Sequence, residues 1–391
     1  MKQNLPNILL ISIDGVRADV AYSGKFKTLS ELYNNSVVFK KVVSAAPLTP
    51  ISHATVLSGL YPEGHGIRHL FLEQMLDEVI TLPQILKRYN YSTSAIVSCP
   101  GLNKWYGFSR GFDSYDDKVP LTADGKDALH TVDVKTRGFA AKKADEVCAK
   151  TVQLLDNLDQ SPFFYFIHFF DAHWPYLPPV PYSETFKDNM YEGEVAYIDK
   201  YLGELFETLK QKGLYDDLLL IVFADHGEDL NGLYSNDHGG EQLGHPEEEG
   251  HGSLLYDATQ MVPLMIKLPK KDNKVKIIDK QVRLVDITPT ILEYLGINVE
   301  TGFNGVSLIN HINGEGNDLV GYSETFYPLE NAEQVAKYPN LHNLKAIRIK
   351  DGDTEYKVIW HMDSDFAEVY NLNSDPDEKR NLFIAQNIKG I

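Results

Sequence analysis

Short apolar runs alternate with amphipathic helical segments along most of this chain, and this alternation limits the possible folds more than any other feature. Five runs have the length and composition of buried strands: Ile8–Ile13, Ser94–Ser98, Phe163–Phe169, Leu218–Phe223 and Val262–Lys267. Helical periodicity lies between and after them, over residues 81–89, 138–158, 194–210 and 286–295. Strands that alternate with helices are typical of a mainly parallel sheet with helices on both faces. We therefore expect an α/β fold, specifically an α/β/α sandwich.

The pattern changes after about residue 316. Short segments separated by turn residues follow one another, at 319–323, 346–350, 356–360 and 369–372. This spacing predicts a small C-terminal antiparallel sheet, followed by a terminal helix. We expect an α/β domain over residues 1–315 and a C-terminal subdomain over residues 316–391, packed on it as one folded unit.

The charge and hydropathy patterns exclude some partners. The formal net charge is −18, whereas proteins that bind polymeric nucleic acid carry a basic surface. No run reaches the roughly twenty apolar residues of a membrane-spanning helix, and the first residues lack the pattern of a signal peptide. We therefore expect a cytoplasmic protein without membrane contact. Cys99 and Cys148 have no metal-ligand partner at short spacing, so both are expected to be small buried residues. The oligomeric state is left open.

Acidic and histidine residues follow three of the predicted strands. Asp14 follows the first, Asp171 and His173 follow the third, and Asp225 and His226 follow the fourth. An aspartate after a strand is often only a turn residue. In an open parallel sheet, however, the carboxyl ends of the strands form the functional edge. The three sites together therefore indicate a single functional centre.

Histidines concentrate around the fourth predicted strand end, at His226, His238, His245 and His251. Carboxylates with neutral imidazoles are a ligand set for zinc, manganese or iron, whereas calcium prefers oxygen ligands only. The alternative is a polar loop in which the histidines are incidental.

The segment from Ala46 to Pro62 reads as a loop followed by a helix. Thr49 would lie near the N-terminus of that helix, where free N–H groups and the helix dipole favour an anion. The simpler interpretation makes Thr49 or Ser52 an ordinary N-cap. A nucleophile at this place would also resemble a cap, so both interpretations stay open.

These motifs resemble the sulfatase branch of the alkaline phosphatase superfamily over nearly the whole chain. The segment Thr49–Pro62 is similar to the Cys-x-Pro-Ser-Arg motif and its Thr-Gly-Leu-Tyr-Pro-like continuation, with Thr49 at the Cys position and His53 at the Arg position. Further similar motifs lie at His65–Arg68, Gly111–Tyr115, Asp171–Tyr176, Asp225–Glu228, Gly250–Gly252, Leu255–Asp257, Val285–Thr290, Val369–Leu372 and Asp375–Pro376.

The chain also departs from the sulfatase pattern. Sulfatases convert the motif Cys or Ser to formylglycine, but the extra methyl group of Thr49 would make the oxidation product a ketone. We therefore expect no formylglycine. Asp14 with Gly15, and Asp225 with His226, resemble instead the nucleotide pyrophosphatase/phosphodiesterases, which use a Thr nucleophile and transition metals. The motif proline is displaced to position 50.

The resemblance implies one or two divalent transition metal ions, zinc or manganese. The first is expected to be held by Asp14, Thr49, Asp225 and His226. A second is implied at Asp171 and His251, with His173 either a further ligand or a substrate contact. His53 and Arg68 are expected to contact the oxygens of the substrate.

The resulting hypothesis is a metal-dependent hydrolase of a small-molecule phosphate ester, either a phosphodiesterase or a phosphatase, with Thr49 as nucleophile. The alternatives within enzymes are a sulfatase that works without formylglycine and a phosphoryl transferase. A non-catalytic binding protein is the alternative from another class. Such a protein is expected to lose metal ligands, yet this chain has all four of the first site.

Overall fold

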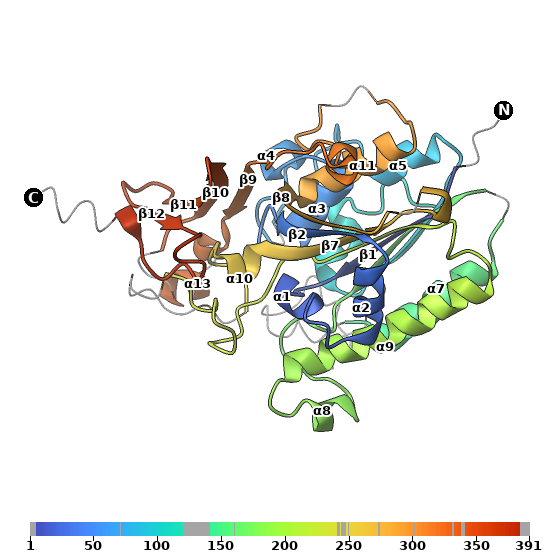
Figure 1. Ribbon diagram of the computed structural model, residues 1–391, viewed down its shortest axis with the longest axis horizontal. Coiled ribbons are helices and arrows are strands. Elements are labelled where there is room, and N and C mark those ends of the chain that lie inside the picture. Colours follow the sequence, from blue (N-terminus) through green and yellow to red (C-terminus); the bar gives the residue numbers. More distant parts are fainter. Residues whose placement is uncertain are drawn as a thin grey trace, which may run out of the picture.

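A large eight-stranded sheet forms the centre of the computed structural model (Figure 1). The structure describes residues 5–383 except positions 71, 120–140, 160, 241–242, 244–247, 249, 273, 300–301, 331 and 338–340. The strand order is β4 (Ser114–Asp116), β3 (Ser92–Ile96), β5 (Phe163–Phe169), β1 (Ile8–Ile13), β6 (Leu219–Phe223), β7 (Met261–Lys267), β2 (Val37–Val43) and β8 (Lys276–Arg283). Only β7 runs antiparallel to its neighbours in this sheet, and the other pairs are parallel.

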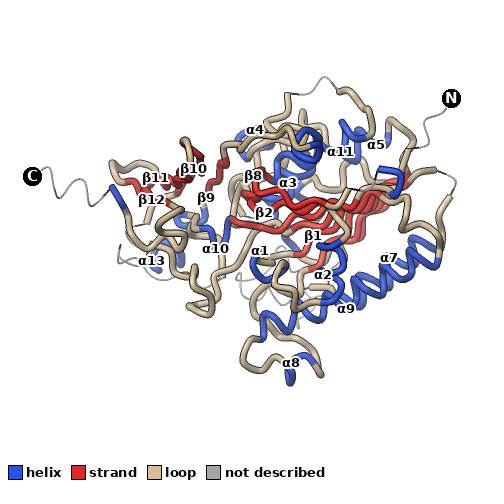
Figure 2. The backbone as a smooth tube through the Cα atoms, in the orientation of Figure 1, coloured by secondary structure: helices blue, strands red, loops and turns tan. Residues whose placement is uncertain are grey.

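Helices cover both faces of this sheet (Figures 1 and 2). One face carries α1 (Ala18–Ala21), α2 (Lys27–Asn34), α7 (Ala144–Asp156) and α9 (Met190–Gln211), with α8 (Tyr182–Thr185) beyond them. The other face carries α3 (Thr49–Ser58), α4 (Pro62–His65), α5 (Leu82–Lys87), α11 (Ile287–Tyr294) and α12 (Ile309–Asn313). The predicted α/β/α sandwich is therefore confirmed. Its core consists of the apolar strands, and β1, β5 and β6 are buried along their whole length.

A four-stranded antiparallel sheet lies at one end of the molecule, on the left in Figure 2. Its order is β12 (Ala367–Asn371), β11 (Thr354–His361), β10 (Leu344–Asp351) and β9 (Gly321–Thr325). The predicted small C-terminal sheet is confirmed. The terminal helix expected after it lies mostly outside the described residues. Two short helices lie beside this sheet, α10 (Asp257–Gln260) and α13 (Ala332–Lys337).

The sequence pattern missed three strands of the large sheet, β2, β4 and β8. β2 carries Lys40 and Lys41 at its centre, and β8 is an edge strand in which charged residues alternate irregularly with apolar ones. β4 has only three residues. The edge strands β4 and β8 bury less surface, so they do not need the continuous apolar run that marks a central strand. β2 lies inside the sheet and escaped prediction because its two lysines interrupt its apolar run. Within the described residues, no helix is both long and apolar enough to cross a lipid bilayer.

A buried group of charged side chains joins the two sheets. Lys357 of β11 is 2% exposed, and its ammonium lies 2.9 Å from Asp257 Oδ1 and 2.8 Å from Glu378 Oε1. Arg348 of β10 lies 3.3 Å from the other oxygen of Asp257 and 3.0 Å from Glu355. Asp257 is the first residue of α10, which directly precedes β7. These ion pairs therefore connect the small sheet to the start of β7 in the large sheet.

We predict that Lys357→Met destabilises the protein by about 3–5 kcal/mol, because it leaves Glu378 buried without its cation. Urea denaturation of the full chain measures this loss. The matched control is Lys200→Met, which removes an exposed pair with Glu204 on α9 and should cost at most about 1 kcal/mol. Equal small losses in the two variants would show that the buried ion pairs contribute little.

Candidate active site

Four predicted residues meet at the carboxyl edge of the large sheet. Asp14 directly follows β1, and Asp225 and His226 follow its parallel neighbour β6. Because the two strands run side by side in the same direction, their ends deliver these side chains to one place. Thr49 reaches it as the first residue of α3. Asp14, Asp225 and His226 have no exposed surface, whereas Thr49 keeps 7%.

The distances between these side chains are short. Thr49 Oγ1 donates a hydrogen bond to Asp14 Oδ2 at 3.1 Å and lies 3.5 Å from His226 Nε2. The same nitrogen of His226 lies 3.6 Å from Asp14 Oδ1 and 3.5 Å from Asp225 Oδ2. A hydroxyl, two carboxylates and an imidazole are therefore directed at one small volume.

This donor set fits a divalent cation. One atom each from Asp14, Asp225 and His226 can be chosen so that all three lie within 4.8 Å of one another. Asp14 Oδ1 and Asp225 Oδ2 are fully buried, and neither has a hydrogen-bond partner among the described residues. A buried carboxylate oxygen without a partner is costly, and a cation between the two groups would satisfy both.

Burial also sets the protonation of these groups. It raises the pKa of Asp14, although His226 and His173 partly lower it. Burial by itself would lower the pKa of His226, but Asp225, Asp14 and Glu228 raise it, and the net shift is upward. A bound cation would favour the ionised carboxylates and the neutral ring.

Thr49 is not an N-cap, and neither is Ser52. Leu48 occupies the N-cap position of α3, and no side chain caps the helix. Thr49 instead directs its hydroxyl to Asp14, while the Ser52 hydroxyl donates to the carbonyl oxygen of Asp225 at 2.8 Å. The simpler interpretation of this segment is wrong, because the hydroxyl of Thr49 faces the Asp14 carboxylate and not the backbone N–H groups of the first turn.

His53 lies beneath the site and is fully buried. Its Nδ1 contacts the carbonyl oxygen of Thr49 at 2.7 Å, and its Nε2 contacts Ser12 Oγ at 2.8 Å. A carbonyl oxygen can only accept, so Nδ1 carries the proton and Nε2 accepts from the Ser12 hydroxyl. Burial lowers the pKa of His53 to about 4. Both nitrogens thus have protein partners, so His53 supports α3, and its expected contact with substrate oxygens stays a prediction.

Arg68 is held by the small sheet. Its guanidinium forms a two-point ion pair with Glu324 of β9, at 2.7 and 2.9 Å, and lies over the ring of Phe326. None of the contacts described for Arg68 is with Asp14, Thr49, Asp225 or His226. The expected contact of Arg68 with substrate oxygens therefore stays a prediction.

One carboxylate oxygen of Asp171 contacts the start of α7, and the other, Oδ2, is buried without a hydrogen-bond partner among the described residues. Its Oδ1 accepts a hydrogen bond at 3.0 Å from the backbone N–H of Ala144, the first residue of α7, and Lys143 lies 3.9 Å away. Burial raises the pKa of Asp171 to about 7, although Lys143 lowers it in part. The described residues contain no group of candidate metal ligands that joins Asp171 with His251. The structure therefore does not assemble the second metal site that the resemblance implies.

His251 instead pairs with Glu228, to which the sequence analysis gave no role. The two side chains are 3.1 Å apart from Nδ1 to Oε1, and Glu228 is fully buried. The His251 ring lies 4.0 Å from that of His226 and 4.8 Å from that of His173, between centroids. Burial raises the pKa of Glu228 to about 7 and lowers that of His173 to about 4. The position of Glu228, three residues after Asp225, was the available signal.

The other two histidines of the sequence cluster lie elsewhere. His238 Nδ1 lies 3.6 Å from Asp229 Oδ1, and its backbone N–H donates to the other oxygen of Asp229 at 2.7 Å. His245 lies outside the described residues.

The sequence analysis also missed His168 and Cys99, which lie behind Asp14. His168 Nε2 is 3.2 Å from Asp14 Oδ2, and burial lowers the pKa of the ring to about 4. Cys99 can be grouped with these two residues within 4.8 Å. Burial raises the pKa of its thiol well above the usual value. Cys99 and Cys148 are both buried and unpaired with each other, as expected. No signal in the sequence distinguishes His168 from a core residue, because it lies inside a strand.

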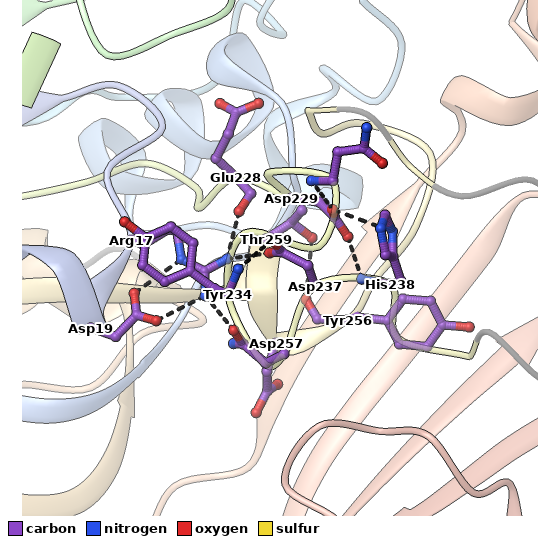
Figure 3. A network of polar contacts seen from close by, with 12 residues as sticks. Arg17, Asp19, Glu228, Asp229, Tyr234, Asp237, His238, Tyr256, Asp257 and Thr259 are labelled. Carbon is purple, nitrogen blue, oxygen red and sulfur yellow. Dashed lines mark hydrogen bonds and ion pairs between the residues drawn. The ribbon is translucent and has the colours of Figure 1, made fainter. Parts of the chain in front are cut away.

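A buried arginine fixes the loop that follows β6 (Figure 3). Arg17 donates to the carbonyl oxygen of Glu228 at 2.8 Å and to Asp237 Oδ1 at 2.8 Å. It also pairs with Asp19, and its guanidinium lies over the ring of Tyr234. The loop that carries Asp225 and His226 is therefore anchored to the segment after β1, close to Asp14.

Comparison with known proteins agrees with this geometry. The sequence pattern described as sulfatase matches residues 6–297, and the one described as N-sulphoglucosamine sulphohydrolase, C-terminal, matches residues 251–391. An N-acetylglucosamine-6-O-sulfatase of Bacteroides thetaiotaomicron is 25% identical over 52% of this chain, which spans 32% of that relative. An arylsulfatase of Clostridium perfringens is 22% identical, with 98% of this chain and 91% of that protein covered. The phosphonate monoester hydrolase of Agrobacterium radiobacter shares the fold, with a TM-score of 0.72 at 20% identity, covering 96% of this chain and 91% of that one.

Gly15 makes the close approach of Glu228 possible. Its φ is +65°, and a Cβ there would lie 2.8 Å from Glu228 Oε2. We predict that Gly15→Ala destabilises the protein by about 2–4 kcal/mol, from backbone strain together with the clash. Gly24→Ala is the control, because Gly24 has a φ of +79° but no described atom within 4 Å of its Cβ position. Gly24→Ala should be destabilised by the backbone strain alone, by about 1–2 kcal/mol. Urea denaturation measures both, and equal losses would contradict the close approach.

Proposed function

We propose that this chain, which belongs to the sulfatase family, is a metal-dependent hydrolase of small phosphate esters with the Thr49 hydroxyl as its nucleophile. One observation carries the proposal. Thr49 Oγ1 lies at the start of a helix, hydrogen-bonded to Asp14 Oδ2, beside two buried carboxylate oxygens for which the described residues supply no hydrogen-bond partner. A hydroxyl held next to a candidate cation site is the arrangement expected of an activated nucleophile.

A divalent transition metal, with zinc or manganese our choice, would be held by Asp14, Thr49, Asp225 and His226. When bound, it would lower the pKa of the attacking hydroxyl and neutralise charge on the substrate. The chain itself supplies the geometry. Asp14 orients the Thr49 hydroxyl by accepting its hydrogen bond, and the first turn of α3 offers backbone N–H groups to an anion.

The proposed reaction has two displacements. Thr49 Oγ1 forms a bond to phosphorus while the bond from phosphorus to the leaving alcohol oxygen breaks. Asp14 Oδ2, which accepts the hydrogen bond of Thr49, takes the hydroxyl proton, and solvent protonates the leaving oxygen. Water then attacks the phosphorus of the covalent intermediate, the bond from phosphorus to Thr49 Oγ1 breaks, and the Thr49 oxygen regains its proton as the phosphate, or from a diester the phosphate monoester, leaves. His251, whose ring adjoins that of His226, and His173, whose ring adjoins that of His251, are the groups we place against the substrate.

Sulfate esters are the second candidate substrates, because the sequence matches to sulfatases favour them. The residue type at position 49 favours phosphate. Threonine cannot become formylglycine, so any sulfatase activity would have to proceed through the unmodified hydroxyl. The chain spans only 32% of the N-acetylglucosamine-6-O-sulfatase. The activity proposed for this chain is therefore based on the residues of the site and not on that similarity. A transferase would share the first displacement and use another alcohol in place of water.

We predict that Thr49→Ala lowers phosphoesterase turnover by several orders of magnitude, because it removes the attacking oxygen. The assay uses an aryl phosphate monoester, a diaryl phosphate and an aryl sulfate, each with zinc or manganese. The control is Thr151→Ala, which removes a buried hydroxyl of α7 that donates to the Val147 carbonyl oxygen. It should keep near-normal turnover. A folded Thr49→Ala variant with normal turnover would refute the nucleophile, and faster hydrolysis of the sulfate would refute the substrate class.

We also predict that residues 47–62 carry no formylglycine or other oxidised residue. The physical reason is the methyl group on Cβ of Thr49, which prevents an aldehyde product. Mass spectrometry of the intact protein and of the peptide that contains Thr49 should give the masses of the unmodified sequence. A peptide that reacts with an aldehyde-specific hydrazide would contradict the prediction.

A further inference from the structure

We propose that His168 is a positioning residue for the metal site: it holds the Asp14 carboxylate by one oxygen, leaves the other free for the cation, and thereby sets metal affinity. This role rests on the metal site of the proposed function. It concerns affinity for the cation rather than the identity of the substrate, so the two can be tested separately.

His168 lies in the middle of the sheet, directly beside β1. It is opposite Ser12 in the parallel pairing of β5 with β1, two residues before Asp14. The ring is fully buried, and its Nε2 lies 3.2 Å from Asp14 Oδ2. The backbone N–H of Asp14 donates to the carbonyl oxygen of Phe169 at 2.9 Å, so the main chain of Asp14 is tied to the same strand.

The hydrogen bonds of the ring decide which nitrogen carries the proton. The backbone N–H of Ser98 donates to His168 Nδ1 at 3.4 Å. Nδ1 must therefore present a lone pair, and the ring proton lies on Nε2, directed at Asp14 Oδ2. Ser98 is itself fixed, because its hydroxyl donates to the carbonyl oxygen of His168 and its own carbonyl oxygen accepts from the N–H of Lys142.

The two oxygens of Asp14 consequently have different roles. Oδ2 accepts from both His168 and Thr49, whereas Oδ1 has no hydrogen-bond partner among the described residues and lies 3.6 Å from His226 Nε2. Rotation of the carboxylate would break two hydrogen bonds. Asp14 is therefore held with its bare oxygen directed at the expected cation before the cation arrives.

A different use of His168 is geometrically conceivable, since Asp14, Cys99 and His168 could themselves surround a cation. The Ser98 hydrogen bond argues against this. It leaves the proton on Nε2, the nitrogen that such a cation would need as a ligand. The geometry therefore assigns His168 to the support of the first site.

The test compares His168→Asn with His168→Gln in the zinc-loaded full chain. The Asn side chain can accept from Ser98 at the place of Nδ1 but is too short to reach Asp14. The Gln side chain can place an amide N–H donor at the place of Nε2. Competition with a chromophoric chelator measures the zinc dissociation constant, and urea denaturation measures the stability of each variant.

Loss of a hydrogen-bond partner of a metal ligand typically weakens metal binding about 10–100-fold. We expect zinc affinity to fall by this factor in His168→Asn and to change at most about threefold in His168→Gln. Unchanged zinc affinity in both variants, with lowered stability, would reduce His168 to a core residue and overturn the proposal. An equal loss of affinity in both folded variants would overturn it too, because the donor to Asp14 would then be irrelevant. If the wild-type chain binds no zinc, manganese or other transition metal, the proposed metal site itself fails, whatever the substrate.

Discussion

The structure depends on two buried carboxylates that end neighbouring parallel strands. Asp14 and Asp225 have no exposed surface, and each has one oxygen without a described hydrogen-bond partner. Two buried carboxylates this close repel one another and are poorly solvated, and a cation between them relieves this cost. The surroundings compensate with neutral donors: the N–H of Gly15 donates to Asp225, and His168 and Thr49 donate to Asp14. A preformed anionic cage of this kind is what a site for a divalent metal requires.

The cage also explains how an acidic protein can act on an anion. With a formal net charge of −18, the chain would repel a phosphate ester at long range. A cation in the cage and the start of α3 provide the local positive potential. Thr49 lies where these two fields meet, so one position serves both to bind the anion and to present a nucleophile.

Charged side chains outside the proposed metal site fix the positions of neighbouring segments of the chain. Arg17 connects the loop after β6 to the segment after β1 (Figure 3). Lys357 connects the small sheet to α10, the helix that directly precedes β7. Glu324 of the small sheet holds Arg68, which the sequence had suggested for the substrate. The C-terminal sheet is therefore joined to the rest of the chain by ion pairs at Arg68 and Asp257.

The sequence by itself determined the fold class, because the central strands are continuous apolar runs. It also predicted that Asp14, Asp225 and His226 meet, because parallel strands bring their carboxyl ends to one edge, whereas Thr49 was predicted from its place before a helix and from the resemblance of its motif. The edge strands β4 and β8 escaped prediction, since edge strands need no continuous apolar run, and β2 escaped because two lysines interrupt its apolar run. Only the tertiary structure decided where other polar side chains point. Asp171 follows a strand as Asp14 does, yet its Oδ1 accepts a hydrogen bond from the first residue of α7, a contact that sequence spacing does not reveal. His168 lies inside a strand, where sequence spacing cannot separate a donor to Asp14 from a core residue, since only the neighbouring strands determine what its ring meets.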